Sequence, residues 1–169
     1  MADQKISALS DGSPVVSTDN LVLARGAANY RLAAADLAKF MPGYQLDYVV
    51  HAPSDLTVTA TNAAAAQTLI DGNPVVFDGS TTVQLSWYAI VASNGGTLIV
   101  RLWDWATDLG SIAMAYTSVG TTTLQVSQFL TPTAGSHTFH IRVYKDATGA
   151  TTSVSGSAGF PSWYRITRA

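Results

Sequence analysis

The chain has 169 residues, 12% of them charged, a net charge of −2 and no cysteine, which excludes disulfides, thiolate nucleophiles and cysteine-ligated metals. Its three lysines and six arginines are too scattered to form a basic stripe, so nucleic acid is not expected as a partner. The longest apolar run, Trp87 to Ala92, is too short to span a bilayer and the first residues lack a signal-peptide pattern, so we expect a soluble protein without membrane insertion.

Residues 1–43 are predicted to form an N-terminal segment that cannot fold alone. Two short extended runs lead into a helix expected at Ala33 to Phe40, on which Leu37, Phe40 and Met41 share one apolar side. A helix of about two turns is marginal in water unless its apolar side is covered. Pro42 and Gly43 end this helix and mark the boundary. The segment therefore needs a host surface.

Residues 44–169 are predicted to form an all-β domain, because the apolar pattern changes to a period of two and turn residues interrupt it regularly. Val83 to Ala92 and Thr97 to Trp105 are interpreted as a hairpin around Asn94-Gly95-Gly96. Further strands are expected at Leu56–Ala60, Val75–Phe77, Ser111–Thr117, Thr122–Leu130, Thr138–Tyr144 and Trp163–Thr167. Together these predict an antiparallel two-sheet sandwich of the jelly-roll type.

One predicted strand, Thr97 to Trp105, has two apolar faces. Leu98, Val100 and Leu102 form one face, while two tryptophans lie on the other, so we expect the second face to be covered as well. A subunit interface, burial under the chain's own loops and a glycan-stacking platform all remain open for this face. The candidate residues for a subunit interface or glycan site are Tyr88, Ile90, Trp103, Trp105 and Tyr164.

Candidate catalytic and metal-binding groups are weak. Of the three histidines, His137 and His140 lie three residues apart on or beside a strand, which directs their side chains to opposite faces. No G-x-S-x-G elbow is present. Asp71, Asn73 and Asp78, or Asp104 with Asp108, could offer oxygen ligands to calcium, but neither set matches a full binding loop. We therefore expect no cofactor, no metal and no enzyme.

The opening residues carry a resemblance to a known class of protein. The order K-I-S-x-L at residues 5–9, S-T-D-x-L-V-L-A-R-G at 17–26 and R-L-x-A-x-D-L at 31–37 resembles the N-terminal segment of tailed-phage virion proteins that precedes a β-rich domain. The run from Ala134 to Tyr144, with Trp163 to Thr167, resembles the last strands of trimeric jelly-roll heads similar to the tumour necrosis factor and C1q families.

These resemblances imply a non-enzymatic virion structural protein, a homotrimeric capsid decoration or head fibre that binds other virion proteins. Attachment through the N-terminal segment would involve Ile6, Leu9, Val15, Val16, Leu21, Leu23, Leu37 and Phe40. The alternatives are a tail fibre or tail-tip receptor-binding protein, or a carbohydrate-binding module that binds a host-surface glycan through exposed aromatic residues. Since the chain has no shaft repeat, its length favours a compact capsid protein.

Overall fold

The computed structural model describes residues 20–25, 28–117, 119–146 and 150–169. It divides into two compact units, residues 1–44 and residues 45–169, which we describe separately. We call them the N-terminal unit and the β unit.

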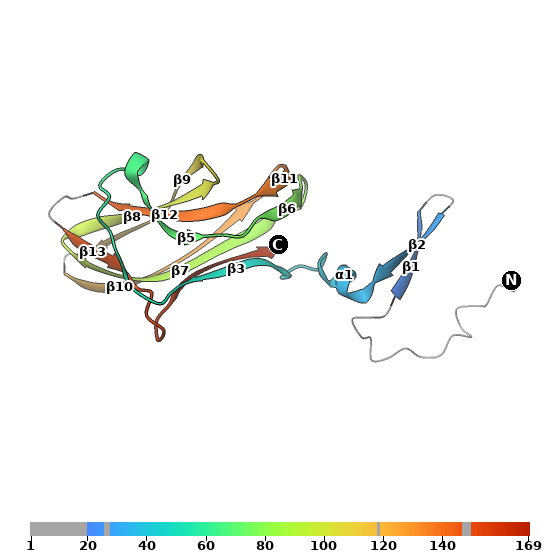
Figure 1. Ribbon diagram of the computed structural model, residues 1–169, viewed down its shortest axis with the longest axis horizontal. Coiled ribbons are helices and arrows are strands. Elements are labelled where there is room, and N and C mark those ends of the chain that lie inside the picture. The colour runs from blue at the N-terminus through green and yellow to red at the C-terminus, as the bar shows by residue number, and fades with distance from the viewer. Residues whose placement is uncertain (1–19, 26–27, 118, 147–149) are drawn as a thin grey trace, which may run out of the picture. The chain divides into compact units, whose positions relative to one another are not determined.

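The N-terminal unit contains a two-stranded antiparallel hairpin and one short helix (Figure 1). Strands β1 (Asn20–Arg25) and β2 (Ala28–Ala33) pair along their full length, and α1 (Ala34–Ala38) follows directly. The helix is shorter than the predicted Ala33 to Phe40, because the amides of Lys39, Phe40 and Met41 bond to carbonyls three residues back and tighten the chain into turns. Within the described ranges no helix is long and apolar enough to cross a membrane.

The β unit is built from antiparallel strands with one short 3-10 turn (Figure 1). In chain order the elements are β3 (Gln45–His51), β4 (Leu56–Thr57), η2 (Ala63–Ala65), β5 (Gln67–Asp71), β6 (Val75–Asp78), β7 (Val83–Asn94), β8 (Gly96–Asp104), β9 (Thr107–Thr117), β10 (Gly120–Leu130), β11 (Ala134–His137), β12 (Phe139–Lys145), β13 (Thr151–Val154) and β14 (Ser162–Arg168).

Two main sheets form the sandwich. Sheet I has the order β3, β14, β7, β10, and β13 and β4 continue it where β7 extends beyond β14. Sheet II has the order β5, β12, β8, β9, and β6 pairs with β11 as a small separate ribbon. The chain alternates between the sheets rather than completing one before the other, as in a jelly roll. The predicted fold class, an antiparallel two-sheet jelly roll, is confirmed.

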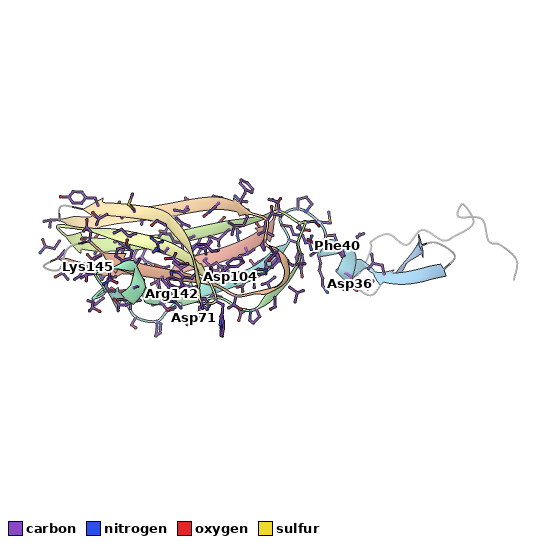
Figure 2. The ribbon with its side chains drawn as sticks, turned by 90° about the horizontal axis from the view of Figure 1, so that it is seen from above. Asp36, Phe40, Asp71, Asp104, Arg142 and Lys145 are labelled. Atoms are coloured by element: carbon purple, nitrogen blue, oxygen red, sulfur yellow. The ribbon has the colours of Figure 1, made fainter. Side chains whose placement is uncertain are left out.

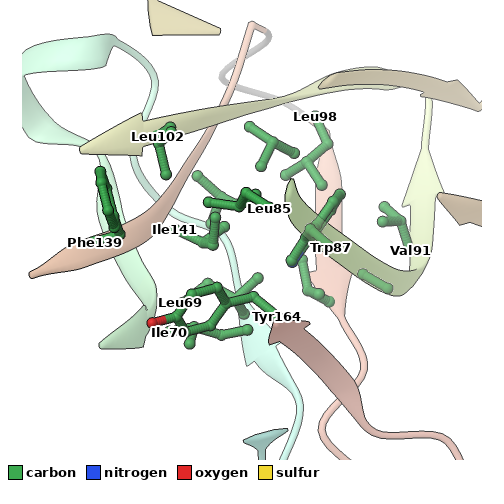
Figure 3. Close-up of a cluster of buried hydrophobic side chains, with 14 of the residues drawn as sticks. Leu69, Ile70, Leu85, Trp87, Val91, Leu98, Leu102, Phe139, Ile141 and Tyr164 are labelled. Carbon is green, nitrogen blue, oxygen red and sulfur yellow. The ribbon is translucent and has the colours of Figure 1, made fainter. Parts of the chain in front are cut away.

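The core lies between the two sheets, and the period-two pattern of β7 fills its centre (Figure 3). The inward residues of β7, namely Val83, Leu85, Trp87, Ala89 and Val91, are all fully buried. Facing them across the sandwich are inward residues of β8 and β12, among them Leu98, Leu102, Phe139 and Ile141. Since successive side chains of a strand point to opposite sides, the residues between these face outward on each sheet.

The predicted hairpin between β7 and β8 is wrong, although both strands exist. β7 pairs with β10, β13 and β14 in sheet I, whereas β8 pairs with β9 and β12 in sheet II. The turn at Gly95, whose φ of 84° suits glycine, passes the chain from one sheet to the other. Both strands are apolar on their inner sides. Each therefore buries more apolar surface by facing the core from its own sheet than by pairing with the other strand.

Candidate functional site

The predicted interface or glycan residues do not form one surface. Tyr88 and Ile90 lie half-buried on the outer side of sheet I. Trp103 lies half-buried on the outer side of sheet II, and Trp105 follows β8 with 71% of its surface exposed. The structure therefore separates these aromatic residues onto opposite outer faces of the sandwich.

Tyr164 lies in the core, so its predicted surface role is wrong. Its side chain is 1% exposed and it pairs in register with Trp87. Its hydroxyl donates a hydrogen bond to the buried carboxylate of Asp47. The alternation of β14 turns Tyr164 inward, and the residue turned outward in its place is the neighbouring Trp163.

An aromatic cluster covers part of the outer side of sheet I. Trp163 stacks on Tyr88, with ring centroids 5.8 Å apart and planes inclined by 17°. Tyr48, which lies on β3, contacts the same Trp163 indole, with ring centroids 6.2 Å apart. Val50 pairs in register with Trp163, and Ile90 follows Tyr88 on the same side of β7. We call Tyr48, Val50, Tyr88, Ile90 and Trp163 the aromatic face.

The aromatic face carries little charge. The outward residues of β7 and β10 are all uncharged, namely Gln84, Ser86, Tyr88, Ile90, Ala92, Thr121, Thr123, Gln125, Ser127 and Phe129. The cation beside the cluster is Arg165, whose guanidinium lies 5.8 Å from the centroid of the Trp163 ring. Tyr48 keeps 46% of its surface exposed and Val50 keeps 37%. A surface rich in Tyr and Trp and poor in charge has the composition of a protein–protein interface core.

The outer side of sheet II is covered by its own side chains instead. The guanidinium of Arg142 lies 4.2 Å from the centre of the Trp103 ring, a cation–π contact. Ile99, on the same side of β8, is 8% exposed. Trp103 is thus covered from within the chain, which is the alternative to an interface that the sequence left open.

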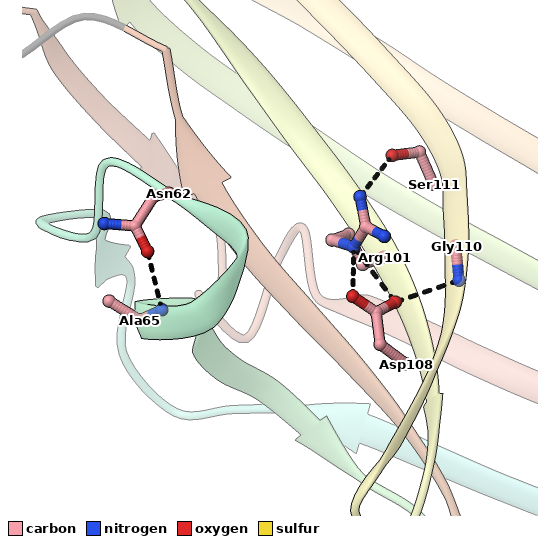
Figure 4. A network of polar contacts seen from close by, with 6 residues as sticks. All are labelled: Asn62, Ala65, Arg101, Asp108, Gly110 and Ser111. Atoms are coloured by element: carbon pink, nitrogen blue, oxygen red, sulfur yellow. Dashed lines mark hydrogen bonds and ion pairs between the residues drawn. The ribbon is translucent and has the colours of Figure 1, made fainter.

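A second arginine on this side forms a polar network (Figure 4). Arg101 Nε donates to both carboxylate oxygens of Asp108, at 3.0 and 2.8 Å, and its Nη1 donates to Ser111 Oγ at 3.0 Å. Burial raises the pKa of Asp108, but the hydrogen bonds from Arg101 and the Gly110 amide and the charges of Arg101 and Arg142 outweigh it, so the pKa lies below its ordinary value of 3.8.

We expect Asp108→Asn to lower the free energy of unfolding at pH 7 by about 1 kcal/mol, since it weakens a charge-assisted network. The folded-state pKa of Asp108 is depressed, so its stabilisation is present above pH 3.8 and is lost as the pH falls through the folded value. Urea unfolding at a series of pH values measures this. A difference between the two proteins that grows toward low pH would contradict the assignment.

A cavity of about 240 Å³ opens beside Trp105. It is lined by Trp105, Ala106, His140 and Arg142. The ring centroids of Trp105 and His140 are 6.3 Å apart. His140 Nδ1 contacts the carboxylate of Asp71 at 2.7 Å. Sequence reasoning missed this grouping, because it considered His140 only together with His137 and did not single out Arg142.

A second cavity, of about 260 Å³, has a histidine and a carboxylate in its lining. His137 Nδ1 lies 2.5 Å from Asp104 Oδ2, and His137 Nε2 lies 3.2 Å from Thr133 Oγ1 and 3.0 Å from the Thr133 carbonyl oxygen. The carbonyl contact needs a hydrogen on Nε2, and Nε2 could not then accept the proton of the Thr133 hydroxyl. Through these contacts, His137 links the segment after β10 to the end of β8.

The carboxylates considered for calcium lie in separate places, each with its own partner. Asp71 contacts His140, and Asp104 contacts His137. Asp78 accepts from the Ser80 and Thr81 amides and the Thr81 hydroxyl, which closes a turn; these hydrogen bonds, that of the Thr81 side chain first, lower its pKa. Among the described residues, no three His, Cys, Asp or Glu side chains converge as metal ligands do.

The predicted attachment residues fall partly outside the described ranges. Four of them lie outside the described residues, namely Ile6, Leu9, Val15 and Val16. Leu21 and Leu23 belong to β1. Leu37 is 43% exposed and Phe40 is 62% exposed. Met41, which shares their predicted side, is 59% exposed. The end of the N-terminal unit therefore presents apolar surface to solvent.

Comparison with known proteins adds information on the fold. No protein-family model and no curated protein matches the chain. Among solved structures, it is similar to an Eiger TNF from S. frugiperda, with 8% identity and a TM-score of 0.47 over 76% of this chain and 94% of that one. It is also similar to the infectious bursal disease virus Gt strain structure, with 8% identity and a TM-score of 0.46.

The viral match covers 89% of this chain, which spans only 43% of the viral one. A third similar structure is a carbohydrate-binding module of Cellvibrio mixtus lichenase 5A in complex with cellotriose, with 23% identity and a TM-score of 0.35 over 76% of this chain and 99% of that one. At these identities and TM-scores the likenesses assign no activity to this chain.

Proposed function

We propose that this chain is a non-enzymatic virion structural protein of a tailed phage. In this proposal it is a homotrimeric capsid decoration or head-fibre protein whose residues 1–43 attach it to another virion protein. The β unit is then the projecting head. The observation that carries the self-association is the aromatic face, a partly exposed cluster of Tyr and Trp with little charge around it.

The aromatic face supports contact between copies for two physical reasons. Tyr and Trp contribute large rigid contact areas and are enriched at interface cores, where charged residues are depleted. The face is also formed by paired strands of one sheet, β3, β14 and β7, so its shape is fixed before any partner arrives. A preformed surface loses little conformational entropy on binding. Three copies related by a threefold axis could each bury this face against their neighbours.

The attachment role of the N-terminal unit rests on its sequence resemblance and on its exposed apolar residues. Helix α1 has only five residues, and a helix of that length has little stability of its own in water. Leu37 and Phe40 remain exposed within this unit. Docking of this unit onto a capsid or tail protein would bury them, and three linked copies would bind more tightly together than singly.

Sedimentation equilibrium tests the self-association. We expect the full chain at micromolar concentration to sediment at three times its monomer mass of 17.8 kDa. A stable monomer at that concentration would contradict the trimer, and a stable dimer would contradict the threefold arrangement.

Deletion of residues 2–40 tests the attachment. We expect the truncated protein to fold and sediment as a trimer but to be absent from purified particles, whereas the full chain joins them. The two proteins are compared by adding each to particles that lack the protein and measuring its occupancy by electron microscopy. Assembly of the truncated protein at full occupancy would refute the attachment role, and the same maps distinguish a capsid from a tail location.

A further inference from the structure

We propose that the cavity formed by Trp105, Ala106, His140 and Arg142 binds an acidic sugar, a pyranose unit that carries a carboxylate. We call it the Trp105 pocket. It lies on sheet II, on the opposite side of the sandwich from the aromatic face, so this inference does not depend on trimer formation. Figure 2 labels Arg142 and Asp71, which come from the adjacent strands β12 and β5.

The first step of the argument is a guanidinium that has no carboxylate within ion-pair distance in the described part of the chain. Arg101 and Arg142 lie opposite each other in register on β8 and β12. Arg101 is neutralised by two hydrogen bonds to Asp108, and Asp71 is engaged with His140. Within the described ranges no ion pair joins Arg142 to a carboxylate. The guanidinium of Arg142 therefore remains available to an anion.

The second step is the state of that guanidinium. Its Cζ lies over the Trp103 ring, 4.2 Å from the ring centroid, which restricts the position of the guanidinium. Its Nε is buried and has no hydrogen-bond partner in the described part of the chain. A buried donor without a partner is unfavourable, and the fork of donors on a guanidinium is suited to bind a carboxylate with two parallel hydrogen bonds. Arg142 also lines the Trp105 pocket, so a ligand there can reach it.

The third step is an exposed aromatic ring beside the cation. Trp105 is 71% exposed, and its φ of 52° places a non-glycine residue in the left-handed region. Its amide donates to the Thr138 carbonyl at 2.8 Å, which holds this conformation. Unusual backbone conformations of this kind persist where surrounding structure maintains them and are common at ligand-binding sites. An exposed indole offers an apolar face on which the C–H side of a sugar ring can stack.

A carboxylate that contacts the lining residue His140 supplies acceptors for hydroxyls. The Asp71 carboxylate, whose side chain is 74% exposed, contacts His140 Nδ1 and keeps acceptor capacity for a ligand hydroxyl. The cavity volume of about 240 Å³ is below the range of pockets for drug-sized ligands, which suits one sugar unit rather than an enclosed chain. One aromatic ring, one free cation and one exposed acceptor together match a ring with both hydroxyls and a carboxylate.

The experiment is a calorimetric titration of the full chain with a galacturonic acid trisaccharide. The matched ligand is the same trisaccharide with its carboxylates methyl-esterified, which keeps the rings and removes the charge. We expect the acid to bind about tenfold or more tightly than the ester, as a charge-assisted pair predicts. Equal affinity for the ester would overturn the role of Arg142, and absence of binding to both would overturn the site.

Three variants locate the binding. Trp105→Ala should remove binding of the acid, and Arg142→Gln should reduce its affinity to that of the ester. Tyr116→Ala is the matched control, because Tyr116 is an aromatic residue of the same sheet with the same exposure of 71%, and it does not line the pocket. Unchanged binding by Arg142→Gln, or an equal loss with Tyr116→Ala, would overturn the proposal.

Two further measurements separate sugar binding at the Trp105 pocket from loss of fold or assembly and from general anion binding. Circular dichroism and sedimentation show whether each variant retains its fold and oligomeric state, so that a loss of binding is separated from a loss of assembly. Inorganic phosphate is titrated as a competing anion. If phosphate alone binds as tightly as the trisaccharide, the pocket is a general anion site and the assignment to a sugar is wrong.

Discussion

Replacing Asp47 with alanine is expected to lower the free energy of unfolding of the β unit by about 3 kcal/mol or more. Asp47 is 6% exposed and accepts four hydrogen bonds, from the amides of Tyr48 and Asn73, the Asn73 side chain and the Tyr164 hydroxyl. Alanine removes all of these acceptors and leaves the buried hydroxyl of Tyr164 without a partner. Urea denaturation followed by tryptophan fluorescence measures the change.

A double-mutant cycle with Tyr164→Phe separates the parts of this effect. Phenylalanine keeps the ring in the core and deletes the hydroxyl, so Asp47→Ala should cost less in the Tyr164→Phe background than alone. Asp55→Ala is the control, because Asp55 is an exposed aspartate that accepts from one amide, that of Gly156 at 2.9 Å. A loss below about 1 kcal/mol for Asp47→Ala would mean that water replaces its hydrogen bonds.

The second large effect is expected at the aromatic face. In the native protein the Tyr88 ring stacks on Trp163. Tyr88→Asp replaces this ring with a negative charge in the middle of the proposed contact between copies. Because a carboxylate buried without a partner costs several kcal/mol, and the proposed trimer would contain three copies of it, we expect the variant to be monomeric at micromolar concentration. Sedimentation equilibrium and light scattering measure the mass.

Tyr116→Asp provides the matched control for this prediction. It makes the same substitution at an exposed tyrosine of β9 in sheet II, where Tyr116 is 71% exposed. We expect this variant to remain trimeric. A trimeric Tyr88→Asp protein, or a Tyr116→Asp protein that dissociates equally, would place the contact between copies elsewhere. Thermal unfolding of both variants checks that each monomer retains its fold.

Much of the fold could be predicted because the longest strands have strong periodic patterns. In β7 every second residue from Val83 to Val91 is apolar, and each of these is fully buried. The partners of β7 could not be predicted, because alternation specifies which side is buried and not which strand lies beside it. A short turn at Gly95 is compatible with a hairpin and with a change of sheet, and the structure has the second.

Short strands escaped prediction for a different reason. β13 (Thr151–Val154) lies in a region where no strand was predicted, and it becomes a strand through pairing with β7 and β4. β5 (Gln67–Asp71) likewise gains its conformation from β12. The four residues of β13 and the five of β5 carry too little periodic signal to indicate a strand, so tertiary pairing determines their conformation.

The candidate sites were only partly predictable from sequence. The need to cover the second face around Trp103 was recognised, but the covering residue, Arg142, is 39 positions away and reaches Trp103 only because β12 pairs with β8. Tyr164 was predicted to lie at a surface site but is buried, because a strand bounded by loops gives no internal indication of which side faces the core. The aromatic residue of β14 that faces outward is Trp163, which is half-buried.

The order of strands in sheet I has a consequence for biosynthesis. Strand β14, residues 162–168, lies between β3 and β7, so Tyr48 and Tyr88 are joined into one surface by a residue made more than seventy positions later, Trp163. A nascent chain that lacks these residues has an open gap in the middle of the sheet and only fragments of the aromatic face. The proposed contact between copies through the aromatic face therefore requires the complete β unit, including its last strand.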